Sequence, residues 1–368
     1  MAVELLTFDP DGDLLLRLPY PAEEVEGIKS KDGKMDTQTV GDNGSGDNME
    51  GIMILEEGAD DLMKESGPLR EIHMLVSAKH LTVASPVFRA MLQHSNFKEG
   101  NELRRLGRVE VPLPDDDHVA FGIMMHIIHG RVRKIPRKVS LEVMTNLSIL
   151  VDKYQTLEVF ELILDVWMPE LEKNFPATLN DEVLPWLSIA WVFQLPDPFK
   201  KLTKILENRG NGIVDGEREK SLPIPSRIFD KIEARRQEAI QEALNHLESF
   251  FRKYQAPGGV CKASKKPFYG PHNIACDGTM IGTFLRSASS HDLWPAPLAP
   301  FKGWSVRFMT TTIGSLDIKS MCDVNKVRER WEPEPTRSHG VMETLDAQMY
   351  EIEQGLQGLD IKSFLAKS

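Results

Sequence analysis

The hydrophobic positions along the chain repeat with two different periods. In the first third of the chain they alternate, so that Ile72, Met74 and Val76 fall on one face, which is the pattern of a half-buried strand. The segment DPDGD between two short apolar runs is typical of a turn, and we expect those runs to pair as a hairpin. The expected strands cover residues 3–8, 13–18, 71–76 and 109–113.

Elsewhere the apolar residues recur at every third or fourth position, which predicts helices. Ser85 and Pro86 are residue types that favour the start of a helix, after one short helical turn. Asp115–Asp117 precede a second helix, where negative charge suits the helix dipole. The expected helices cover residues 81–84, 86–92, 118–129, 139–155, 156–173, 181–195, 196–207, 226–254 and 344–365.

The last of these helices carries apolar residues at heptad spacing. Because the pattern is shorter than a stable coiled coil requires, we interpret the segment as a helix that docks on its own protein. The alternative is a helix that binds a partner. The residues at these positions are Leu345, Met349, Ile352, Leu356 and Leu359.

Two stretches show neither period. Residues 21–67 consist mainly of Gly, Asp, Glu, Ser and Asn, a composition that predicts a disordered insert because it cannot bury a core. Residues from 256 to about 338 are rich in Gly, Pro and Ser, and we expect them to be irregular. We therefore divide the chain into an α/β domain over 1–175, a helical region over 176–255, and an irregular segment over 256–368 that ends in the amphipathic helix.

Composition narrows the class of protein. The chain of 368 residues has 44 basic and 55 acidic residues, and its net charge of −11 disfavours nucleic acid as a partner. No stretch approaches the roughly 20 apolar residues of a membrane span, so we expect no membrane partner. The N-terminus lacks the pattern of a secretory signal. We expect a soluble protein in the cytoplasm, the nucleus or both.

The sequence contains none of the common catalytic motifs, and we expect a protein that is not an enzyme and needs no cofactor. Three cysteines near the C-terminus are too few for a disulfide framework. Cys261, His272 and Cys276 are weak candidates for zinc ligands, with His291 or Cys322 as the fourth. Because no Cys-x-x-Cys pair supports them, we assign no metal. A metal- or cysteine-dependent enzyme in this segment is the alternative from another class.

A basic run follows the helix over 118–129. Cations are favourable at the C-terminal end of a helix, so the run is consistent with a solvated face. Its functional alternative is a patch for an acidic partner or for nuclear import. The basic residues are Arg131, Arg133, Lys134, Arg137 and Lys138.

Three segments together resemble the BTB/POZ domain, an α/β interaction module. They are IHMLVSAKHLTVASPVFRAML, VEVPLPDDDHVAFGIMMHIIHG and VSLEVMTNLSILVDKYQTLEVFEL, the last with the LVDKYQ phrase that closes the domain. The chain is most similar to fungal proteins with this domain, because it shares their HGRVRKIPRKVSLE run, WVF helix and acidic low-complexity loop. The resemblance implies an α+β fold, a small sheet flanked by a helical cluster, followed by a mostly helical C-terminal region.

The same resemblance implies a protein–protein interaction scaffold. Many BTB proteins bind a cullin and act as substrate adaptors of ubiquitin ligases, through a loop that contains an apolar residue, any residue and then Glu. Phe97, Lys98 and Glu99 occupy that place in this sequence. The alternative for Phe97 is that it covers the core of its own domain. Other BTB proteins homodimerise, so a nuclear regulatory protein that self-associates is the alternative function.

Overall fold

The computed structural model describes residues 3–20, 70–212, 221–261, 272–322 and 337–365. The chain divides into two compact units, residues 1–83 with 88–132, and residues 84–87 with 133–368.

The boundaries that we expected at residues 175 and 255 both lie within the second unit. Residue 175 lies between η4 (Glu172–Asn174) and α7, and residue 255 is the last residue of α10. The expected disordered insert over 21–67 lies outside the described residues.

A four-stranded sheet forms the base of the first unit. Its strand order is β1-β3-β2-β4, with β3 parallel to β1, and β2 antiparallel to β3 and parallel to β4. The strands are β1 (Val3–Thr7), β2 (Leu14–Tyr20), β3 (Arg70–Val76) and β4 (Val109–Pro112). All four expected strands are therefore present, in a mixed α/β unit.

The expected hairpin between the first two strands is wrong, because β3 lies between β1 and β2. The turn that joins β1 to β2 instead wraps the end of β3. The backbone N–H of Phe8 donates to the carbonyl oxygen of Leu75 at 2.8 Å, and the Asp13 carboxylate accepts the N–H of Ala78 at 2.7 Å. A Cβ on Gly12 would lie 2.8 Å from a carbonyl oxygen of β3, so this close approach requires glycine.

The first unit adds short helices to the sheet. They include α1 (Ala78–Ala84), α2 (Pro86–Gln93), α3 (Lys98–Leu106) and α4 (His118–Ile128). The expected start of α4 is confirmed, since the side chain of Asp117 accepts the N–H of Ala120 at 2.7 Å. Alternation of the strand residues buries Leu14, Leu16 and Met74 completely.

One ion pair on the sheet makes a testable prediction about acid stability. Arg17 donates to the Glu71 carboxylate at 2.9 Å and His73 lies 3.0 Å from it, which lowers the pKa of Glu71 from 4.5 to about 2. The native state favours the ionised form, so this stabilisation is present above about pH 4.5 and is lost as the pH falls towards 2. In Glu71→Gln we expect the melting temperature, measured by circular dichroism, to fall less steeply than in the native chain as the pH decreases. An equally steep fall in the variant would contradict this assignment.

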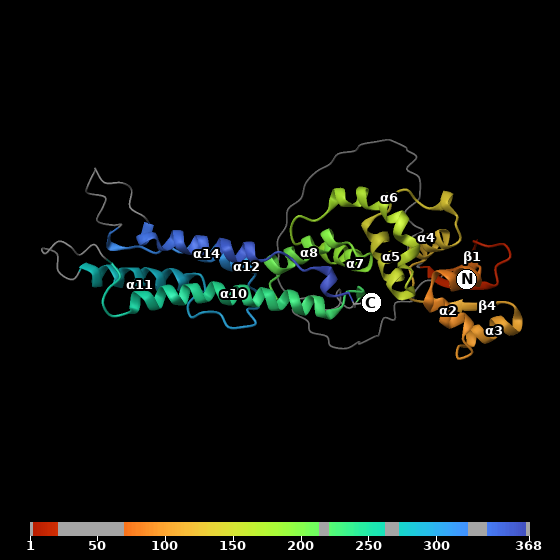
Figure 1. The fold of residues 1–368 in the computed structure, drawn as a ribbon, viewed down its shortest axis with the longest axis horizontal. Helices are drawn as coiled ribbons and strands as arrows, with labels where there is room; N and C mark the ends of the chain where they lie inside the picture. Colours follow the sequence, from red (N-terminus) through yellow and green to blue (C-terminus); the bar gives the residue numbers. More distant parts are fainter. Residues whose placement is uncertain (1–2, 21–69, 213–220, 262–271, 323–336, 366–368) are drawn as a thin grey trace, which may run out of the picture. The chain divides into compact units, whose positions relative to one another are not determined.

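The second unit is helical in its described residues. Its longer helices are α5 (Leu141–Tyr154), α6 (Glu161–Leu171), α7 (Val183–Val192), α8 (Pro196–Arg209), α10 (Ser226–Gln255), α11 (His272–Ser290), α12 (Val306–Gly314) and α14 (Val341–Gly355). The longest of these helices is α10, with 30 residues, and α11, α12 and α14 pack along it (Figure 1).

The expectation that the segment from residue 256 is irregular is wrong over α11 and α12. Glycine and serine lower the helix propensity of α11, but its buried residues recur at every fourth position and join one core with α10. These residues are Cys276, Met280, Phe284 and Ala288. Tertiary burial therefore outweighs local propensity in α11.

The terminal amphipathic helix docks on its own protein, as expected, but it ends at Gly355 rather than at residue 365, so Leu356 and Leu359 lie beyond it. Leu345, Met349 and Ile352 of α14 are buried in the core that α10, α11 and α12 share. The alternative of a partner helix would need this face to be free, and in the folded chain it is covered.

Candidate functional site

Phe97 lies at the N-cap of α3, and 45% of its surface is exposed. It is therefore an exposed residue and not part of the buried core. Lys98 is exposed and Glu99 is half-buried, in the first turn of α3, where a carboxylate suits the helix dipole. The three residues form one surface, which we call the Phe97 segment (Phe97–Glu99).

Hydrogen bonds from side chains of α3 hold the loop before it in place. Asn101 donates through its side-chain amide to the carbonyl oxygen of Ser95 at 2.8 Å, and Arg104 donates to that of Gln93 at 2.9 Å. Gly100 is buried, and a Cβ there would lie 2.8 Å from a backbone oxygen of α2. The start of α3 thus packs backbone to backbone on α2, which holds Phe97 in place while leaving it exposed.

The basic run divides between the two units. The guanidinium carbon of Arg131 lies 5.8 Å from the centre of the Phe8 ring, a cation–π contact in the first unit. Lys138, in the second unit, pairs with Glu170 at 3.0 Å. The exposed remainder is Arg133, Lys134 and Arg137.

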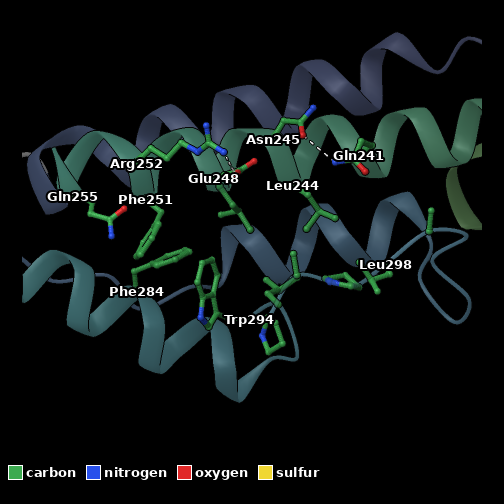
Figure 2. Close-up of a pocket in the computed structure, with 16 residues that line it drawn as sticks. Gln241, Leu244, Asn245, Glu248, Phe251, Arg252, Gln255, Phe284, Trp294 and Leu298 are labelled. Carbon is green, nitrogen blue, oxygen red and sulfur yellow. Dashed lines mark hydrogen bonds and ion pairs between the residues drawn. The ribbon is translucent and has the colours of Figure 1, made fainter.

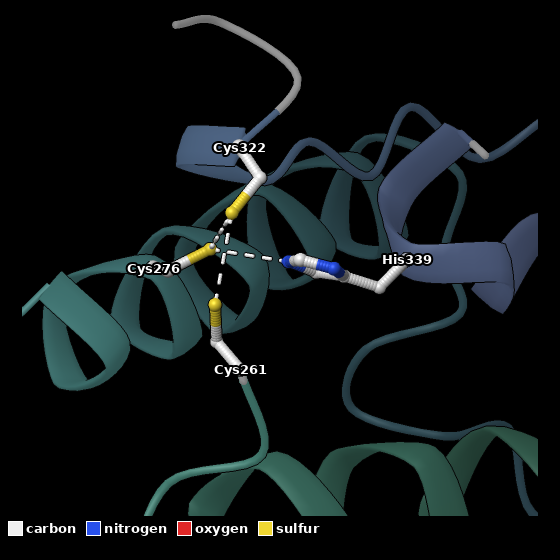
Figure 3. A group of neighbouring side chains, drawn as sticks. All are labelled: Cys261, Cys276, Cys322 and His339. Atoms are coloured by element: carbon white, nitrogen blue, oxygen red, sulfur yellow. Dashed lines mark hydrogen bonds between the residues drawn. The ribbon is translucent and has the colours of Figure 1, made fainter. Parts of the chain in front are cut away.

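Three cysteines and one histidine of the second unit converge into a cluster, the Cys/His cluster (Cys261, Cys276, Cys322 and His339; Figure 3). Their ligand atoms all lie within 4.8 Å of one another. The Sγ atoms of Cys261 and Cys322 are 3.6 Å apart, and those of Cys276 and Cys322 are 3.8 Å apart. His339 Nε2 lies 3.3 Å from Cys276 Sγ.

Each member of the cluster comes from a different part of the unit. Cys261 follows α10, Cys276 is on α11, Cys322 follows α12, and His339 is in the short 3-10 helix η6 (Arg337–Gly340) just before α14. The buried carboxylate of Asp277 accepts the backbone N–H of Cys261 at 3.1 Å. This bond fixes the loop after α10 against α11, so that Cys261 meets Cys276.

Burial raises the pKa of two thiols of the cluster. Cys261 and Cys276 are buried, Cys322 is partly buried, and His339 is exposed. Burial raises the pKa of the Cys276 thiol, and burial followed by the neighbouring thiols raises that of Cys322 to about 12. Three thiol sulfurs and one imidazole nitrogen are donor types that soft metal ions take as ligands.

The sequence anticipated only part of this cluster. The structure brings together Cys261, Cys276 and Cys322, but His291 is exposed beyond the far end of α11. His272 begins α11, and its side chain lies outside what the structure describes. His339 was missed because no short spacing links it to a cysteine.

A pocket of about 420 Å³ lies between α10 and residues 293–299 (Figure 2). The centre of the Trp294 ring lies 4.9 Å from that of the Phe251 ring, in a tilted arrangement, and 6.0 Å from that of the Phe284 ring, edge to face. The charged side chains on its rim, Glu248 and Arg252, pair with each other at 2.5 Å. The pocket is therefore an apolar groove whose rim charges are already neutralised.

Among the described residues, no helix is long and apolar enough to cross a membrane. Comparison with known proteins finds no matching family model, no matching curated protein and no matching solved structure.

Proposed function

We propose that this chain is a non-enzymatic protein-interaction scaffold of the BTB type, and that the Phe97 segment binds a cullin scaffold of a ubiquitin ligase. The observation that carries the proposal is the exposure of Phe97 on a braced loop. Aromatic side chains, including Phe, are enriched in protein interfaces relative to the rest of the surface.

The local geometry supports a preformed binding surface. The bonds from Asn101 and Arg104 and the close packing of Gly100 hold the loop before any partner arrives, so little ordering entropy is lost on binding. Glu99 places a carboxylate two residues from Phe97, which adds electrostatic selectivity for a basic patch on the partner. An adaptor of this kind would use its helical second unit to recruit a substrate.

Self-association is the second candidate, in a nuclear regulatory protein. It is favoured by β1, which lies at an edge of the sheet and exposes 58% of the surface of Leu5. An edge strand presents unpaired backbone groups that another copy of the chain can pair with. This candidate predicts a concentration-dependent dimer and no binding to a cullin.

We expect Phe97→Ala to weaken cullin binding by at least about tenfold, since truncation of an interface hot spot costs about 2 kcal/mol or more. Binding of the purified full chain to cullin scaffolds would be measured by pull-down and then by interferometry. Leu106→Ala is the matched control, because Leu106 is exposed on the same helix α3, outside the Phe97 segment.

The outcomes separate the two candidates. Normal cullin binding by a Phe97→Ala, Glu99→Ala double variant would refute the placement of the surface. A native chain that binds no cullin would refute the adaptor role, and light scattering over a range of concentrations would then test self-association.

A further inference from the structure

We propose that Cys261, Cys276, Cys322 and His339 form a four-coordinate structural zinc site that closes one end of the helical second unit. The proposal is independent of cullin binding, because all four residues belong to the second unit and the Phe97 segment belongs to the first.

The distances match the ligand shell of zinc. Tetrahedral zinc, with Zn–S bonds of about 2.3 Å and Zn–N bonds of about 2.0 Å, separates two sulfurs by about 3.8 Å and a sulfur from a nitrogen by about 3.5 Å. The sulfur separations of 3.6 and 3.8 Å and the sulfur–nitrogen separation of 3.3 Å are close to these values. Three of the six donor separations therefore fit a zinc tetrahedron, and all six are within 4.8 Å.

The donor set also selects the metal and its role. Three thiolates and one imidazole form a soft set that favours zinc over the oxygen-binding cations Mg²⁺ and Ca²⁺. With four protein ligands no position is left for a water molecule or a substrate, which is the mark of a structural site rather than a catalytic one. Zinc binding would deprotonate the three thiols, because cysteine coordinates zinc as the thiolate.

The backbone at His339 is consistent with a ligand role. His339 and Gly340 both have left-handed φ angles, 57° and 76°, which turn the chain into α14. This conformation is uncommon for a residue other than glycine and tends to persist where other interactions impose it. Here the turn directs the imidazole towards Cys276 (Figure 3).

The position of the cluster explains what the metal would do. The four ligands are 15, 46 and 17 positions apart in sequence and come from the ends of different helices. One ion would therefore join the turn after α10, the body of α11, the segment after α12 and the start of α14. Because these four ligands come together only in the folded chain, the free energy of metal binding adds to the free energy of folding.

The test uses the full chain, purified under reducing conditions and reconstituted with zinc chloride or cobalt chloride alone. We expect about one zinc ion per chain, measured by inductively coupled plasma mass spectrometry. With cobalt we expect a thiolate charge-transfer band and the intense visible bands of tetrahedral coordination. Cys276→Ser and His339→Ala should each lose the bound zinc, whereas His339→Cys should retain it because it restores a fourth soft ligand.

Two histidine controls sharpen the assignment. His291→Ala and His272→Ala should keep full zinc content, since the four ligands are complete without either residue. A native chain that takes up no stoichiometric zinc, or Cys276→Ser and His339→Ala variants that both keep it, would overturn the proposal. So would a cobalt spectrum typical of octahedral coordination, or a protein mass lower by two hydrogens, which indicates a disulfide. The cobalt spectrum of the native chain decides the matter even where a variant fails to fold.

Discussion

An Arg236→Ala variant is expected to lose about 2–4 kcal/mol of unfolding free energy, because it removes a buried guanidinium group that donates to several backbone carbonyl oxygens. Arg236 on α10 has only 1% of its surface exposed. Its guanidinium group donates twice to the Glu233 carboxylate, at 2.7 and 2.6 Å. The same group donates to three backbone carbonyl oxygens, those of Pro300, Phe301 and Trp304.

All five N–H bonds of this side chain are therefore used, and no other residue type supplies five donors in one plane. Alanine would remove this donor from three carbonyl oxygens of the loop before α12, of which that of Phe301 also accepts a backbone N–H, from Trp304. Loss of a hydrogen bond to a charged donor costs free energy. Lysine keeps the charge but has only three donors, so Arg236→Lys should show an intermediate loss.

Urea unfolding followed by tryptophan fluorescence measures this effect. All six tryptophans lie among residues 133–368, so the signal reports the second unit. Arg252→Ala is the matched control on the same helix, since Arg252 is exposed and its pair with Glu248 should contribute less than about 1 kcal/mol. Equal losses in the two variants would show that the buried network does not stabilise the unit.

Gly358→Ala is the second substitution expected to have a large effect, a loss of about 2–5 kcal/mol from backbone strain and overpacking together. Gly358 has a left-handed φ of 78°. A Cβ there would lie 2.0 Å from the carbonyl oxygen of Lys200, which cannot move without shifting α8.

The close approach has a clear cause. The buried carboxylate of Glu207 accepts the N–H of Gly358 at 3.0 Å, and the Thr203 hydroxyl accepts that of Leu359 at 2.8 Å. Arg235 completes the contact by donating to Glu207 at 2.9 Å and to the carbonyl oxygen of Gly358 at 3.2 Å. Backbone groups of the chain after α14 are thus hydrogen-bonded to α8, and a side chain at residue 358 would push this chain away from α8.

Gly355→Ala is the control for this substitution. Gly355 ends α14, its added Cβ would meet nothing within 4 Å, and its φ is not left-handed. The same urea measurement should show little loss, or a small gain from better helix propensity. If both alanine variants had the same stability, the close packing at residue 358 would not contribute to folding.

Local chemistry in the sequence was enough to place many elements. Alternation at Ile72, Met74 and Val76 predicted β3, and Asp117 marked the start of α4, because period and capping are properties of neighbouring residues. The heptad spacing from Leu345 predicted an amphipathic helix with one covered face, and α14 has that face buried. The sequence also predicted an exposed loop around Phe97 after α2, but it did not predict α3, which begins at Lys98.

Only the tertiary structure decided the order of the strands and the membership of the Cys/His cluster. The insertion of β3 between β1 and β2 depends on pairing across 50 or more residues, which the turn at Asp9–Asp13 does not encode. Helix α11 forms despite its glycines because Met280 and Phe284 are buried against α10. His339 joins three cysteines because the helices of the second unit return to one point, and such convergence in space has no signature in sequence spacing.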